Sequence, residues 1–91
     1  MMTPKQREYL EANRRLIDNL DDALLDLLVH RAQVVDALWQ WKEQQALPRT
    51  DPAREAEVVE RLLVRAETKG LSRDAVKPLL TALVGKRLLA G

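Results

Sequence analysis

Apolar side chains recur every three or four positions through the first half of the chain, from about Lys5 to about Gln45. Neither glycine nor proline interrupts this stretch, and polar side chains occupy the opposite face. This spacing predicts one amphipathic helix of about 40 residues. Its apolar positions are Leu10, Ile17, Leu20, Leu24, Leu27, Leu28, Val34, Val35 and Leu38.

Two shorter helices are predicted after the loop "ALPRT". Asp51 followed by Pro52 is a strong start signal, because aspartate caps a helix and proline fits its first position. Lys69-Gly70 is a stop signal for this second helix. Its apolar stripe consists of Val58, Val59, Leu62, Leu63 and Ala66.

The third helix is predicted to be capped by Ser72. Pro78 lies several residues inside, so the pattern predicts either a kink there or a later start near Lys77. The apolar side chains expected on this helix are Leu79, Leu80, Leu83, Val84 and Leu88. No strand pattern is visible, so the sequence predicts an all-α fold of three helices in a single domain, residues 1–91.

The length of the first helix bears on the assembly. About 40 residues of helix measure about 60 Å, whereas a compact domain of 91 residues is only about 30–35 Å across. Half of the helix would protrude with its leucines uncovered, so we expect an intertwined homodimer in which the long helices pack together. A break into a hairpin near Asp21-Asp22 is the alternative, but no glycine or proline favours it.

Composition narrows the class of protein. The formal net charge of +1 gives no indication of nucleic-acid or membrane binding. The chain has no cysteine, which excludes disulfides, thiolate metal sites and cysteine nucleophiles. No apolar run resembles a signal peptide or a membrane span, so the predicted location is the cytoplasm.

A charged residue interrupts the apolar stripe of the first helix. Arg31 takes the place of an apolar residue in the series Leu10, Ile17, Leu24, Arg31, Leu38, and burying a guanidinium is costly unless an anion meets it. Lys42 lies on the same face, about 16 Å further along the helix. On spacing alone, Arg31 could equally form a structural ion pair with Asp36, Asp26 or a C-terminal carboxylate.

Two further places could supply charge to an anion beside Arg31 and Lys42. Arg54 and Glu55 fall in the first turn of the second helix, where free N–H groups favour anions. Arg14 lies about 25 Å from Arg31 on the same helix, so it could share a ligand only from an antiparallel partner chain. The pattern therefore predicts a cationic pocket for a small polyanion, built across a dimer interface.

The segments "RRLIDNLDDALLDLLVHRAQVVDALWQWK" and "LPRTDPAREAEVVERL" resemble the all-helical AroQ class of chorismate mutase. That family has an arginine before an I-D-x-L-D run, then L-L-x-L-L-x-x-R, a lysine eleven residues on, and D-x-x-R-E at the start of the second helix. The resemblance covers roughly residues 10–71. The matching positions are Arg14, Arg31, Lys42, Asp51, Arg54 and Glu55.

The resemblance implies conversion of chorismate to prephenate, a pericyclic rearrangement that needs no nucleophile, metal or redox cofactor. Such an enzyme holds a dicarboxylate in a folded shape and stabilises charge on the breaking ether oxygen. By resemblance, Arg31 and the partner's Arg14 bind the carboxylates, and Lys42 contacts a carboxylate and the ether oxygen. Glu55 accepts a hydrogen bond from the ring hydroxyl, with Asp51 and Arg54 as further substrate contacts.

The C-terminal third departs from the family pattern. Members usually carry a serine and, four residues on, a glutamine or glutamate in the last helix, where this chain has Arg87 and Gly91. Arg87 is expected to be a cation at the helix end. The ending "LVGKRLLAG" is similar to the tails of small bacterial mutases activated by DAHP synthase, the first enzyme of the shikimate pathway. The resemblance thus implies DAHP synthase as a partner.

Other functions fit parts of the same pattern. Isochorismate pyruvate lyases and amino-deoxychorismate mutases share the fold and bind similar anions, although "TDPARE", with both Asp51 and Glu55, favours chorismate mutase. A non-catalytic helical dimerisation module is the alternative from another class. It predicts that Arg31 and Lys42 pair with carboxylates within the protein.

Overall fold

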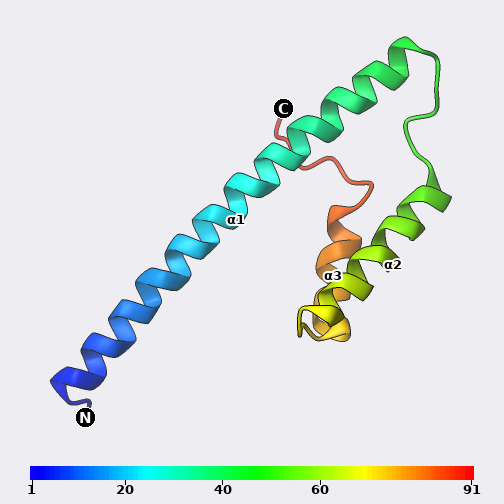
Figure 1. Cartoon of the computed structure of the whole chain (residues 1–91). Coiled ribbons are helices and arrows are strands. Elements are labelled where there is room, and N and C mark those ends of the chain that lie inside the picture. Colours follow the sequence, from blue (N-terminus) through cyan, green and yellow to red (C-terminus); the bar gives the residue numbers. More distant parts are fainter.

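The computed structural model describes residues 1–91 as three α-helices without strands. Helix α1 spans Pro4–Gln44, α2 spans Pro52–Thr68 and α3 spans Arg73–Leu83. The unbroken α1 gives the molecule its greatest dimension of 63 Å (Figure 1). The all-α prediction and the single long first helix are confirmed. None of the helices is both long enough and apolar enough to cross a membrane.

Side-chain caps begin all three helices. Thr3 and Gln6 form a reciprocal capping box before α1. The side chain of Asp51 accepts a hydrogen bond from the backbone N–H of Arg54, at 3.1 Å, and Ser72 accepts one from Ala75 at 3.3 Å. Each cap satisfies a backbone donor that lacks a partner within the helix. The predicted caps of α2 and α3 are therefore confirmed.

The end of the third helix differs from the prediction. Helix α3 starts at Arg73 and contains Pro78, but it ends at Leu83, so placing Val84 and Leu88 on the helix was wrong. Val84 is extended, and Gly85 adopts a φ of +76°, a left-handed conformation that glycine accepts without steric cost. Residues 84–91, hereafter the C-terminal segment, then cross to α1 (Figure 1).

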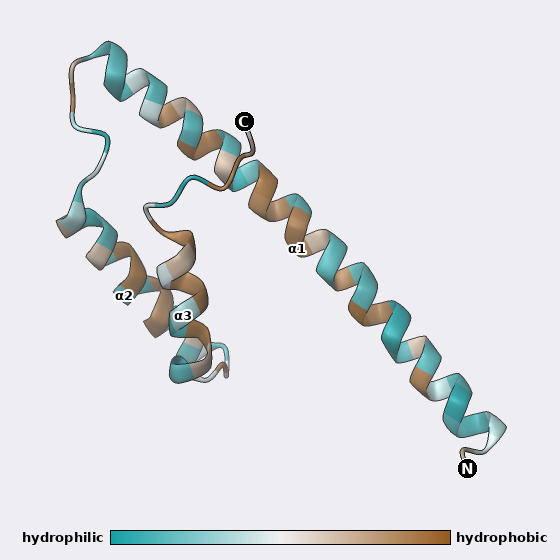
Figure 2. Cartoon of the chain, turned by 180° about the vertical axis from the view of Figure 1, so that it is seen from behind, coloured by the Kyte–Doolittle hydropathy of each residue, from teal (hydrophilic) through white to brown (hydrophobic).

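Helix α1 buries almost none of its apolar stripe within one chain. Helices α2 and α3 pack against each other, whereas α1 packs against neither. Leu24, at the midpoint of α1, keeps 55% of its surface exposed, and apolar positions recur along the free half of the helix (Figure 2). Only four residues of the chain are buried: Ala32, Leu63, Ala66 and Val84.

Ion pairs join the two shorter helices. The guanidinium of Arg73 donates to Glu60 at 2.7 Å and to Glu67 at 2.9 Å. The hydrogen bond from Arg73 lowers the pKa of Glu60 below its ordinary value of 4.5, and the same contacts raise the pKa of Arg73. Arg73 thereby connects the start of α3 to two turns of α2.

We expect the Glu60→Gln variant to lose less stability in acid than the wild type. Because the pKa of Glu60 is lower in the folded state, the ion pair stabilises the fold fully above about pH 4.5, and this contribution is lost as the pH falls through the lower, folded pKa. Urea unfolding between about pH 5 and pH 3 measures the difference. Glu57→Gln, on the same helix but without contact to Arg73, should keep the wild-type slope. An unchanged slope in Glu60→Gln would contradict the assignment.

Candidate active site

The C-terminal segment lies against the face of α1 that carries Arg31. A narrow crevice there is lined by Arg31, Val35 and Trp39 on one side and by Leu88 and Leu89 on the other. Arg31 is half-buried and forms no salt bridge. The structure therefore places Arg31 in contact with apolar neighbours while its charge has no carboxylate partner.

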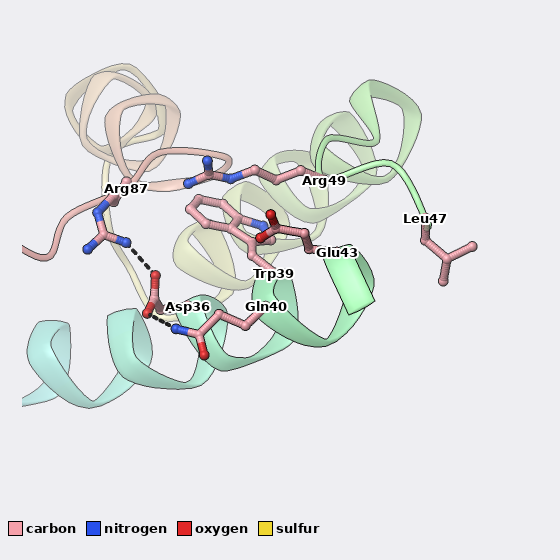
Figure 3. A pocket seen from close by; sticks show the side chains of 7 residues that line it. All are labelled: Asp36, Trp39, Gln40, Glu43, Leu47, Arg49 and Arg87. Carbon is pink, nitrogen blue, oxygen red and sulfur yellow. Dashed lines mark hydrogen bonds and ion pairs between the residues drawn. The ribbon is translucent and has the colours of Figure 1, made fainter. Parts of the chain in front are cut away.

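Asp36, which could have paired with Arg31, forms an ion pair with Arg87 instead. The side-chain amide of Gln40 also donates to Asp36, at 2.9 Å (Figure 3). The expectation that Arg87 is a helix-end cation is thus wrong. Arg87 follows the end of α3, and its charge fixes the C-terminal segment to α1.

A pocket of about 420 Å³ opens beside this ion pair. The guanidinium carbon of Arg49, from the loop after α1, lies 4.1 Å from the centre of the Trp39 ring. Figure 3 shows this stacking, with Glu43 next to the ring and Leu47 pointing away. The pocket combines two cations with two carboxylates around an aromatic ring. Its lining residues are Asp36, Trp39, Gln40, Glu43, Leu47, Arg49 and Arg87.

Lys42 and Asp51 line a second hollow, of about 400 Å³, together with the loop that joins α1 to α2. Lys42 is half-buried and forms no salt bridge. Asp51 is held in place because its carboxylate caps α2. Lys42 of α1 and the residue that caps α2 thus line the same hollow.

Glu55 lies half-buried in the first turn of α2, with its carboxylate against the backbone of Gly85. It lines a third hollow, of about 410 Å³, between α2 and α3. Arg54 is exposed, and its guanidinium lies 3.8 Å from the carboxylate of Glu57. Arg14 is exposed on the part of α1 that extends away from the other helices.

One chain alone does not gather the predicted residues into a single cavity. Arg31, Lys42 and Glu55 line three different hollows along α1 and α2, and Arg14 lies on the exposed part of α1. No group of three or more histidine or carboxylate side chains has the arrangement of a metal site. The arrangement offers unpaired cations and one half-buried carboxylate, which are suited to binding an anion that also carries a hydroxyl group.

Sequence reasoning missed two contacts of this region. Arg87 and Asp36 are 51 positions apart, and helical periodicity cannot pair residues on different elements. Arg49 was read only as part of a loop, although an arginine near a tryptophan favours stacking. Trp39 could have indicated this contact, because a large aromatic ring beside the charged face of α1 favours an arginine stacked on it.

Comparisons with known proteins found a matching family and related proteins. A family model described as chorismate mutase type II matches residues 13–86. The T-protein of Enterobacter agglomerans is 37% identical over 71 residues, which cover 78% of this chain and 19% of that protein. The T-protein of Haemophilus influenzae is 33% identical over 73 residues, which cover 80% of this chain and 19% of that protein.

The chain therefore spans about one fifth of the length of these curated relatives. No solved structure matches it. Since the family model covers most of the chain and ends within the C-terminal segment, the chain belongs to the chorismate mutase type II family.

Proposed function

We propose that the protein is a chorismate mutase that converts chorismate to prephenate in a pocket formed by two chains. The observation that carries the proposal is that Arg31 and Lys42 are partly buried without a counter-ion. Both are half-buried on one face of α1, and neither has a carboxylate partner. Half-buried cations without partners suit a dicarboxylate ligand, and they argue against a module in which these charges only stabilise the fold.

The exposed stripe of α1 supports the second chain. Leu24 is the midpoint of α1, so an antiparallel pair crossing there buries the stripes of both chains. In that pair the partner's Arg14 lies level with Val34, about 4.5 Å along the axis from Arg31 and on the side of Lys42. In a symmetric dimer the partner's Arg14 would therefore lie between Arg31 and Lys42 of the first chain. The same arrangement would occur at both sites of the dimer.

The chemistry follows from these residues. Arginine presents a planar fork that binds a carboxylate with two hydrogen bonds, so Arg31 and the partner's Arg14 hold the two ends of the dicarboxylate. The ammonium of Lys42 stabilises negative charge on the ether oxygen as the C–O bond breaks. Glu55 accepts the hydrogen bond of the ring hydroxyl and thereby orients the ring. Asp51 positions the loop beside Lys42, and Arg54 adds positive charge at the start of α2.

Loss of chorismate absorbance with identification of the product tests this function. Prephenate is the expected product. Release of pyruvate from isochorismate would instead favour a lyase on the same fold, and turnover of amino-deoxychorismate alone would favour that mutase. Absence of turnover with all three substrates would leave the non-catalytic dimerisation module.

We also propose that a DAHP synthase is a partner, because the C-terminal segment is similar to the tails of mutases that such enzymes activate. Gly91 provides no side chain at the position where relatives back up the lysine at the ether oxygen. A cognate DAHP synthase is expected to raise kcat/KM, and no stimulation by any cognate candidate would count against this partner.

A further inference from the structure

Gly85 is the one glycine whose Cα faces a functional side chain. A Cβ built on Gly85 would lie 2.5 Å from Oε1, 2.6 Å from Cδ and 3.0 Å from Oε2 of Glu55. The whole carboxylate therefore faces the position where any other residue would begin its side chain. Carbon and oxygen atoms cannot approach that closely without a shift, so a side chain at position 85 would displace the carboxylate.

We infer that Gly85 is a positioning residue for Glu55. The inference rests on the proposed function, in which Glu55 binds the ring hydroxyl of the substrate. Gly85 acts in two ways. Its φ of +76° turns the chain from α3 toward α1, and its missing side chain leaves the space that the Glu55 carboxylate occupies.

The residues on either side of Gly85 explain why Glu55 rather than the backbone would move. Val84 is buried between α2 and α3, and Arg87 is held by its ion pair with Asp36 on α1. The backbone at residue 85 is thus fixed on both sides, whereas a glutamate side chain can rotate. An added methyl group would therefore swing the carboxylate away from Gly85 and out of its place in the site.

The Gly85→Ala variant is expected to lower kcat/KM by roughly 10- to 100-fold, the usual cost of a small misplacement in an active site. In the Glu55→Ala background, the same substitution should cause little further loss, because the side chain that it would displace is absent. Gly70→Ala is the matched control. Gly70 also has a positive φ, of +88°, but nothing lies within 4 Å of its added Cβ. It should share the backbone strain and keep wild-type kcat/KM.

A second measurement does not depend on turnover. The ¹³C NMR resonance of the Glu55 carboxyl, assigned by its loss in Glu55→Gln, should shift in Gly85→Ala and stay in place in Gly70→Ala. If it shifts while no chorismate is turned over by the wild type, the positioning stands and the proposed function falls. An unmoved resonance, or equal losses of kcat/KM from Gly85→Ala with and without Glu55, would overturn the inference.

Discussion

Replacing Arg31 with alanine should lower kcat/KM for chorismate by roughly 100- to 1,000-fold, with helix content and oligomeric mass unchanged. Removing one partner of a buried, charged hydrogen-bonded pair costs about 2–5 kcal/mol, and each 1.4 kcal/mol is about tenfold in rate. The fold should tolerate the change, because Arg31 forms no salt bridge within the chain. Steady-state kinetics with circular dichroism measures both effects.

Two control variants separate the charge of Arg31 from its shape and from the loss of an exposed arginine. Arg31→Lys keeps the charge but loses the planar fork, so it should recover only part of the activity. Arg15→Ala removes an exposed arginine next to Arg14 and should leave kcat/KM close to the wild-type value. Wild-type turnover in Arg31→Ala would remove this residue from the site.

Replacing Leu24 with glutamate should dissociate the dimer and abolish most of the activity. Leu24 lies at the midpoint of α1 and is exposed in the single chain. In a symmetric dimer each substitution acts twice. Each substitution removes the stabilisation of about 1.5–3 kcal/mol that a buried leucine gives the dimer. Burying each new carboxylate without a partner costs further free energy. Sedimentation measures the mass, and a chorismate assay on the same sample measures the activity.

Gln33→Glu is the matched control for this variant. Gln33 lies on the polar face of α1, on the side of the helix opposite Leu24. Its replacement by glutamate adds the same charge as Leu24→Glu. The control should remain dimeric and active. A Leu24→Glu protein with unchanged mass would show that this stripe is not the interface.

Local signals in the sequence predicted most of the fold. The unbroken 3.6-residue period gave α1 its length, and Asp51 and Ser72 marked the starts of α2 and α3 because their side chains satisfy backbone donors close by. The predictions that failed concern the end of α3, because Val84, Arg87 and Leu88 all lie beyond it. Apolar spacing continued to Leu88, but the chain leaves the helical path at Val84, which is extended, and turns at Gly85.

The sequence alone could predict which residues belong to the candidate site, but not how residues from different elements contact each other. Spacing along α1 placed Arg31 and Lys42 on one face, and both are half-buried there. The pairing of Arg87 with Asp36 and the approach of Gly85 to Glu55 depend on the path of the C-terminal segment between helices. Such contacts arise from tertiary packing, which a helical period does not encode. The position of Arg14 depends on a second chain and stays a prediction.

Mixing two inactive variants tests the shared site most directly. Arg14→Ala and Arg31→Ala chains, each inactive alone, are combined and allowed to exchange subunits. In every heterodimer one site receives both substitutions and the other receives neither, so random exchange should restore about one quarter of the wild-type activity in forming prephenate. Mass spectrometry of the intact dimers verifies the exchange. No recovery in a sample that contains the heterodimer would contradict a site built from two chains.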